Sequence, residues 1–276
     1  MSRDDMIDKC RKIAKQMRID VVKMTFQTGN LGAHIGGGLS MVEIMAVLYG
    51  GVMKLDPTRP LWEDRDRFIL SKGHGALTLY AAMRQKGFIK EGMLETYKQN
   101  DTLLYGHPSI NAELGIEFSS GSLGQGLSLG VGTCLALIRK NNLSSRVFVL
   151  LGDGECNEGS VWEAATSASH YRLDRLIVVI DKNGIQYDGT TNEVLSMEPF
   201  VKKWEAFGFQ TVEVDGHNVE ELYDALSITP KNGVPLAVIA NTVKGKGVSY
   251  MEHNPKYHNA RLSQSDYDKA LSELEV

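Results

Sequence analysis

The chain has 276 residues, of which 42% are hydrophobic and 23% charged, a balance typical of a globular protein with a sizeable core. Its formal net charge of −4 gives no basic field for a phosphate backbone, so we expect no binding to nucleic acid or to an anionic membrane. Three cysteines without a CxxC pair argue against a disulfide framework and a zinc site, and they favour a reducing cytoplasm.

The amino terminus, MSRDDMIDKC, carries acidic residues where a secretory signal would carry basic ones. No uninterrupted apolar run approaches the roughly 20 residues that cross a bilayer. We therefore expect neither export nor a membrane span.

The first part of the chain predicts three helices and one short strand. Ser40 is the expected N-cap of the second helix, and a glycine-rich stretch at 29–38 separates it from the first. The helices are expected at 7–27, 40–53 and 76–86, and the strand at 67–70.

The second part alternates short apolar runs with helix-like segments. The runs are rich in β-branched residues and too continuous for half-exposed strands, so they predict buried parallel strands. Together with the helices they predict one α/β domain over 1–276, with a doubly wound, mostly parallel sheet covered by helices on both faces. The strands are expected at 146–151, 176–180, 210–214 and 236–241, and the helices at 125–139, 160–171, 200–207 and 219–226.

The segment GDGECNEGSVWEAA places Asp153 at the end of a predicted strand, between two glycines and just before a helix. Glycines permit a tight turn and a close approach of the backbone, and a helix amino terminus offers free N–H groups to an anion. The pattern suits a diphosphate, although such turns are also common as purely structural elements.

Asn183 follows the next predicted strand, in LIVVIDKNG. Adjacent parallel strands bring their carboxyl ends to one edge of the sheet, so Asp153 and Asn183 are expected to converge. With a backbone carbonyl, two diphosphate oxygens and a water they would supply about six oxygens, the number that Mg²⁺ takes. The absence of thiolate and imidazole disfavours zinc.

A GDG motif followed by DKN resembles the thiamine diphosphate motif, and the surrounding segments resemble transketolase. They occur in the family's order from about residue 20 to about residue 260: TGNLGAHIGGGLSMVEI, FILSKGHGALTLYAAM, YGHPSI, FSSGSLGQGLSLGVG, GDGECNEGSVWEAA and TVKGKGVSYME.

This resemblance implies a set of cofactor and metal ligands. The metal, Mg²⁺ or another divalent cation such as Ca²⁺ or Mn²⁺, would be held by Asp153, Asn183 and the main-chain oxygen of Ile185. A serine stands at 122, where many relatives have proline. Thiamine diphosphate would be bound by His74, Gly121, Ser122, Leu123, Gly154, Asn183 and His258.

Four of the seven histidines lie in glycine-rich or loop-like contexts, which favours functional roles. By resemblance, His34, His107 and His258 are catalytic histidines that bind substrate hydroxyls and assist proton transfer, for which imidazole is suited. The context of His258, PKYHNA, departs from the family's usual ending. The remaining three, His170, His217 and His253, are expected to be structural or surface residues.

Two acids and two lysines admit both a functional and a structural interpretation. Glu158 and Glu163 resemble glutamates that connect paired active sites across a subunit interface, but acids in a first helical turn are also favoured by the helix dipole alone. Lys244 and Lys246 could meet a phosphate; we expect them instead to lie in a solvated loop and turn.

A terminal helix capped by Ser263 or Ser265 stands where the first domain of a full-length transketolase ends. The resemblance implies that the activating glutamate lies in a second, pyrimidine-binding domain. A separate chain is therefore expected to supply the pyrimidine-binding and carboxy-terminal domains in a two-fold heterotetramer. The expected activity is that of the amino-terminal subunit of a split transketolase, which transfers a two-carbon ketol unit from a ketose or ketose phosphate to an aldose.

Two alternatives remain open. One is a component of a thiamine-dependent decarboxylating enzyme, of the 2-oxoacid dehydrogenase or deoxyxylulose phosphate synthase type. The other is a non-catalytic paralogue. The segment DTLLYGHP also lacks the basic residue that often precedes GHP in relatives, which leaves the sugar substrates open.

Overall fold

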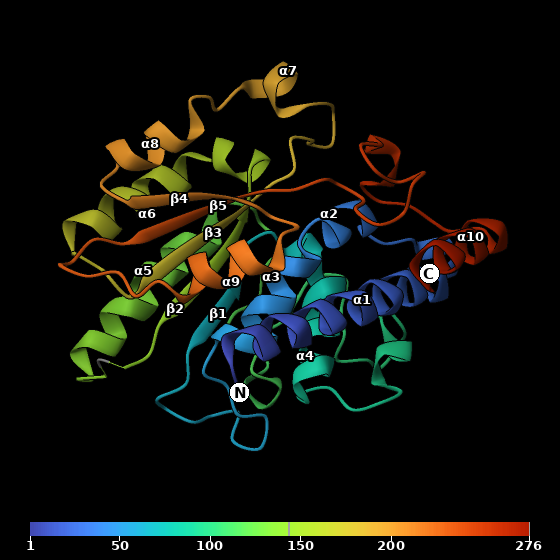
Figure 1. The fold of residues 1–276 in the computed structure, drawn as a ribbon, viewed down its shortest axis with the longest axis horizontal. Coiled ribbons are helices and arrows are strands. Elements are labelled where there is room, and N and C mark those ends of the chain that lie inside the picture. Colours follow the sequence, from blue (N-terminus) through green and yellow to red (C-terminus); the bar gives the residue numbers. More distant parts are fainter. Residues whose placement is uncertain (143, 276) are drawn as a thin grey trace.

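A parallel sheet organises the chain in the computed structural model, which describes residues 1–142 and 144–275. Its strands run in the order β1-β2-β3-β5-β4, and every neighbouring pair is parallel (Figure 1). The prediction of a doubly wound parallel sheet is confirmed. The strands are β1 (Arg67–Leu70), β2 (Val147–Gly152), β3 (Leu176–Lys182), β4 (Gln210–Asp215) and β5 (Leu236–Asn241).

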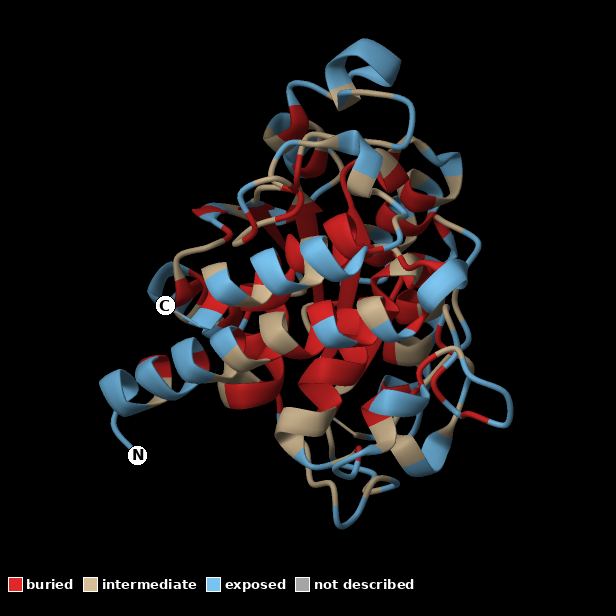
Figure 2. Ribbon diagram, turned by 90° about the vertical axis from the view of Figure 1, so that its right-hand side faces the viewer, coloured by how far each residue is buried: buried red, intermediate tan, exposed pale blue. Residues whose placement is uncertain are grey.

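Helices cover both faces of the sheet because side chains along each strand alternate between two cores. In β2, Phe148 and Leu150 join one core, whereas Val147 and Val149 join the other. Figure 2 shows the buried residues gathered on the sheet and on the inner sides of the helices. The first core packs against α1 (Arg3–Gln27), α2 (Ile35–Leu39), α3 (Val42–Val47), α4 (Ala76–Lys86), α9 (Val219–Ser227) and α10 (Gln264–Glu275). The second packs against α5 (Gln125–Arg139), α6 (Gly159–His170) and α8 (Phe200–Ala206).

Most element boundaries lie within a few residues of those predicted from the sequence. The bounds of β1, α4 and α5 agree with the predicted ones, and α10 begins after Ser263, whose Oγ accepts from the Asp266 N–H at 3.1 Å. A short helix that the sequence pattern did not predict, α7 (Thr191–Leu195), lies in the connection between β3 and α8 (Figure 1).

The helix predicted to start at Ser40 is wrong at its beginning. Part of the glycine-rich stretch is itself helical, as α2, and α3 follows it and continues into a π-helical turn at Leu48–Val52. Ser40 is not a helix N-cap: it is the C-cap residue of α2, and its hydroxyl donates to the buried Asp181 carboxylate at 2.6 Å. A Cβ on Gly36 would lie 2.7 Å from the Tyr257 carbonyl oxygen, so close packing accounts for glycine within a helix.

Residues 210–214 form a parallel strand as predicted, but the prediction that this strand is buried is wrong. β4 pairs only with β5 and lies at the edge of the sheet, where most of its residues are exposed or half-buried. Across the described ranges, none of the helices combines the length and the apolar character needed to span a bilayer.

Candidate cofactor-binding site

Asp153 and Asn183 follow the ends of two neighbouring strands. In the register of β2 and β3, Gly152 lies opposite Asp181, so both following segments leave the same edge of the sheet. The Asp153 carboxylate accepts from the backbone N–H groups of Gly154 at 2.8 Å and Gly184 at 2.7 Å. The strand order therefore produces the convergence that the sequence pattern predicted.

A cavity of about 350 Å³ opens at this edge. It brings together residues from the glycine-rich stretch, from the ends of β1, β2 and β3, and from the two loops at 107–123 and 244–258. Its lining consists of His34, Gly37, Lys72, His74, His107, Gly121, Leu123, Gly152, Asp153, Gly154, Glu155, Asn157, Glu158, Asn183, Ile185, Gln186, Tyr187, Lys244 and His258.

Four histidines form a cluster at the cavity. The ring centroid of His34 lies 5.6 Å from those of His74 and His107, and 5.5 Å from that of His258. Tyr187 packs edge-on against His258 at 5.1 Å between centroids. Segments far apart in the sequence thus bring all four predicted histidines together.

Burial keeps these histidines in the neutral form. It lowers the pKa of His34 to about 4, helped by His107 and Lys98, and it lowers that of His258 to about 3, helped by Lys244. The pKa values of His74 and His107 are also lowered, mainly by burial. A neutral imidazole has one N–H donor and one lone pair, so each ring can donate and accept near neutral pH.

The expectation that Lys244 lies in a solvated loop is wrong. Its side chain is buried, with the residue 2% exposed, and its ammonium donates to the Ile185 carbonyl at 2.8 Å and contacts His258 Nδ1 at 2.8 Å. Burial, followed by the charge of Lys72, lowers the pKa of Lys244 to about 8. Lys246, in contrast, is 37% exposed in its side chain and pairs with Glu252, as expected for a surface turn.

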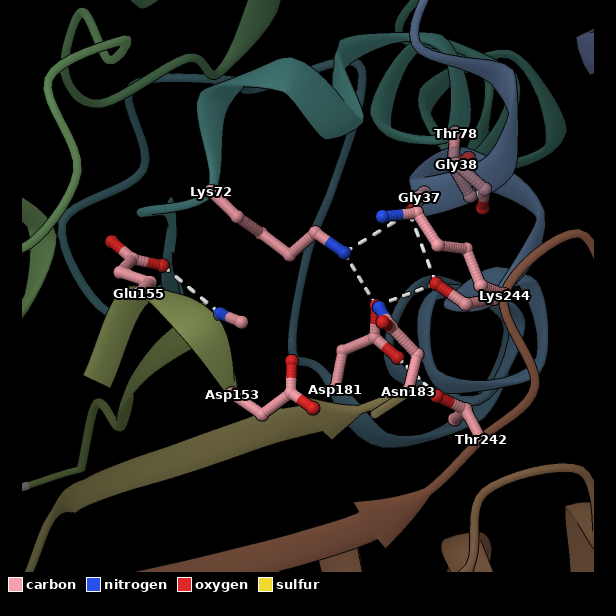
Figure 3. A network of polar contacts seen from close by, with 12 residues as sticks. Gly37, Gly38, Lys72, Thr78, Asp153, Glu155, Asp181, Asn183, Thr242 and Lys244 are labelled. Atoms are coloured by element: carbon pink, nitrogen blue, oxygen red, sulfur yellow. Dashed lines mark hydrogen bonds and ion pairs between the residues drawn. The ribbon is translucent and has the colours of Figure 1, made fainter. Parts of the chain in front are cut away.

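Lys72, in SKGHG, is a second buried lysine at the cavity, and the sequence interpretation did not single it out. Its ammonium forms an ion pair with Asp181 and donates to the Gly37 carbonyl at 3.0 Å (Figure 3). Burial alone would raise the pKa of Asp181, but Lys72 and the surrounding hydroxyl donors outweigh it and lower that pKa. Two buried ammonium groups, of Lys72 and Lys244, therefore line the cavity together with the buried carboxylates of Asp153 and Glu155.

The oxygen donors at the cavity suit a hard cation. Asp153, Asn183 and Ile185 all line it, and burial, followed by the Asp181 charge, raises the pKa of Asp153. Within residues 1–142 and 144–275 no cluster of three or more His, Cys, Asp and Glu side chains is placed to hold a metal. The donor set contains a single carboxylate, with an amide and a carbonyl, so it fits Mg²⁺ when diphosphate oxygens complete the shell.

The loop at 121–124 reaches the cavity through Gly121 and Leu123, whereas Ser122 is exposed and does not line it. Glu155 fixes this loop, because its carboxylate accepts from the N–H groups of Gly124 at 2.8 Å and Gly152 at 3.0 Å. The loop at 121–124 and the GDG turn are therefore held by one buried acid.

Glu158 borders the cavity, and Glu163 lies on the exposed side of α6. The three histidines expected to be structural or surface residues lie outside the cavity lining; His217 contacts Glu43 at 2.9 Å. Gln186 and Tyr187 line the cavity without any sequence signal that pointed to them.

Comparison with known proteins places this chain in a family. Residues 8–275 match the family described as transketolase, thiamine diphosphate binding domain. The chain is 41% identical to 6-deoxy-6-sulfo-D-fructose transketolase subunit SqwG of Clostridium sp. (strain MSTE9), over 96% of this chain and 98% of that protein. It is 40% identical to an apulose-4-phosphate transketolase subunit of Actinobacillus succinogenes, over 97% of this chain and 96% of that protein.

Solved structures agree with this placement. Transketolase from Leishmania mexicana superposes with a TM-score of 0.87 at 30% identity, over 96% of this chain and 41% of that one. The chain thus spans well under half of this full-length transketolase, but nearly the whole of the relatives that are named as subunits. The chain belongs to the transketolase family and corresponds to its thiamine diphosphate binding domain.

Proposed function

We propose that this chain is the amino-terminal, cofactor-binding subunit of a two-chain transketolase. The assembled enzyme moves a two-carbon ketol unit from a ketose or ketose phosphate to an aldose. One observation carries the proposal: a single cavity joins the oxygen donors at the sheet edge to the cluster of four histidines. The relatives named as subunits, which match over nearly their whole length, support it.

Two parts of the cavity would hold the cofactor. Asp153, Asn183 and the Ile185 carbonyl would bind Mg²⁺ or a similar divalent cation, and Lys244 would donate to the diphosphate. When bound, thiamine diphosphate supplies the carbon nucleophile and the electron sink of ketol transfer. The other proposed cofactor contacts line the same cavity and are His74, Gly121, Leu123, Gly154 and His258; Ser122, which the resemblance also implied, lies outside the lining and is not proposed.

The histidines of this chain would bind substrate hydroxyls and carry protons. Lys244, with a pKa of about 8, is protonated near neutral pH and can only donate, so His258 Nδ1 accepts from it and the ring carries its proton on Nε2. His258 is thereby oriented as a donor through Nε2. His34 and His107, being neutral, each offer a lone pair that can accept a hydrogen bond from a substrate hydroxyl and an N–H that can donate one.

The partner is proposed to be a separate chain that carries the pyrimidine-binding and carboxy-terminal domains. Two copies of each chain would form a heterotetramer with two-fold symmetry, with Glu158 and Glu163 at the interface between paired sites. We propose the cytoplasm as its location, where the three free, buried cysteines would stay reduced.

Reconstitution tests the proposed function. The chain is mixed with its co-purified partner, thiamine diphosphate and Mg²⁺, and is supplied with ketose and ketose phosphate donors and an aldose acceptor. We expect aldoses to be lengthened by two carbons without release of carbon dioxide, and negligible turnover by either chain alone.

Other outcomes would contradict the proposal in different ways. Carbon dioxide release from 2-oxoacids without ketol transfer would identify a decarboxylating enzyme. Failure to recover any thiamine-domain partner, together with no turnover in any pair, would identify a non-catalytic paralogue.

A further inference from the structure

Asp181 lies at the centre of a buried polar network beneath the proposed metal site. Its residue is 0% exposed, and its carboxylate accepts from four donors on different segments of the chain. The donors are the Lys72 ammonium, the Ser40 hydroxyl at 2.6 Å, the Thr242 hydroxyl and the Asn183 side-chain amide at 3.3 Å. Figure 3 shows Asp181 between Asp153 and Asn183, with the Lys72 side chain reaching it from above in this view.

Two contacts fix the orientation of the Asn183 amide. Nδ2 donates to Asp181 Oδ2 at 3.3 Å, and Oδ1 accepts from the Ile185 backbone N–H at 3.2 Å. An ionised carboxylate can only accept and a backbone N–H can only donate. Both contacts therefore select the same orientation, with the nitrogen toward Asp181 and the oxygen toward the Ile185 side of the cavity.

The orientation matters because only the oxygen of an amide binds a hard cation. A reversed amide would present NH₂ to the metal. Lys72, which is 1% exposed, balances the charge of Asp181, so the carboxylate can remain ionised in a place without solvent.

We propose that Asp181 is a positioning residue for the metal site, which holds the Asn183 amide with its oxygen toward the cation. This inference rests on the proposed function, because it requires a divalent cation at Asp153, Asn183 and Ile185. Asp181 itself does not touch the cation; it acts through Asn183. Groups that orient a metal ligand in this way commonly change metal affinity about 10- to 100-fold when they are replaced.

The test measures Mn²⁺ binding to the full chain in the presence of inorganic diphosphate, by electron paramagnetic resonance and calorimetry. The unaltered chain is titrated first, since a failure to bind Mn²⁺ would contradict the proposed metal site and this inference with it. Asp181→Asn should weaken binding by about 10- to 100-fold, because the new amide can accept or donate and leaves the Ile185 N–H, at 3.2 Å, as the remaining contact that orients Asn183.

Thr242→Val is the matched control. It removes another hydrogen bond to the same carboxylate without altering a contact of Asn183. We expect it to change Mn²⁺ affinity by less than about threefold, since the amide orientation is retained. An unchanged affinity in Asp181→Asn, or an equal loss in Thr242→Val, would overturn the proposal.

A double-mutant cycle separates positioning from general damage to the fold. In Asn183→Asp both outer atoms are oxygens, so no wrong orientation exists, and the new carboxylate is repelled by Asp181. Adding Asp181→Asn to this variant should therefore not weaken Mn²⁺ binding, in contrast to its effect on the unaltered chain. If Asp181→Asn alone fails to fold, the double variant still provides a test, because it keeps one carboxylate near Lys72. A further loss of affinity in the double variant, additive with that of Asn183→Asp, would contradict the inference.

Discussion

The Lys244 ammonium lies 2.8 Å from the carbonyl oxygen of Ile185. A cation therefore already faces one of the three oxygen donors proposed for the metal, at the end of the cavity where the diphosphate would bind. The same ammonium reaches His258, so it connects the proposed diphosphate end of the cavity to the histidine cluster.

Replacing this lysine should weaken cofactor binding. Lys244→Met removes the buried charge but keeps much of the side-chain volume, and a charge-assisted hydrogen bond contributes about 1.5–3 kcal/mol, so we expect an affinity loss of about 10- to 100-fold. Calorimetric titration of the protein with thiamine diphosphate, in the presence of Mg²⁺, measures this loss of affinity. Lys246→Met, two residues away on the surface, is the control and should bind as the unaltered chain does. If both variants bind thiamine diphosphate with equal affinity, Lys244 does not contribute to cofactor binding and its role is structural.

The Asp153 carboxylate should be essential for metal-dependent binding. It is the only carboxylate in the proposed ligand set, so Asp153→Ala is expected to abolish the part of thiamine diphosphate affinity that depends on Mg²⁺ in the assembled enzyme. Asp188→Ala removes an exposed acid from the loop that follows Asn183 and should have no effect. The affinity for thiamine diphosphate is measured for both variants with Mg²⁺ and with a chelator. If the affinity of the Asp153→Ala enzyme still depends on Mg²⁺, the metal assignment is wrong.

Acid should destabilise the chain through His34. Its pKa is lowered from 6.5 to about 4, so between these values the unfolded chain binds a proton that the folded chain does not. Stability from this group is complete above pH 6.5 and is lost as pH falls through about 4. The titratable side chains that face His34 are His74, His107, His258, Lys98 and Lys244.

Thermal unfolding without cofactor, at about pH 7 and about pH 5, measures this effect. His34→Gln should show a smaller drop in melting temperature between the two than the unaltered chain. His170→Gln, on the exposed side of α6, should leave the drop unchanged. A drop of the same size in His34→Gln would mean that His34 does not contribute to it.

Two glycines of α5 should respond oppositely to alanine. A Cβ on Gly130 would lie 2.6 Å from Val149 Cγ2, whereas a Cβ on Gly132 has nothing within 4 Å. Gly130→Ala should destabilise the fold by about 1–3 kcal/mol through overpacking. Gly132→Ala should stabilise it by about 0.5–1 kcal/mol through helix propensity. Urea unfolding of both variants checks the signs, and a stabilised Gly130→Ala would mean that α5 can shift away from the sheet.

The sequence was most informative where local pattern and topology agree. Continuous apolar runs predicted the parallel strands, and the motifs after β2 and β3 predicted that Asp153 and Asn183 would meet at one edge. Strand order was not predictable from the runs themselves, so the exposure of β4 at the edge was missed.

Long-range contacts account for the other differences. Lys244 is buried because its loop returns over Ile185 and beside His258, and nothing in VKGKG distinguishes it from Lys246. Likewise, serine is a common N-cap residue, but the hydroxyl of Ser40 donates instead to the carboxylate of Asp181, 141 residues later in the chain. Such roles are set by tertiary packing rather than by local sequence.

The most direct test of the proposed cofactor site is a crystal structure of the chain with Mn²⁺ and thiamine diphosphate, with anomalous scattering used to locate the metal. We expect one strong anomalous peak in contact with the oxygens of Asp153, Asn183 and Ile185, at about 2.1–2.3 Å, with the diphosphate completing the shell. A peak elsewhere, or a bound diphosphate without metal at these three oxygens, would contradict the central claim that this chain anchors its cofactor through them.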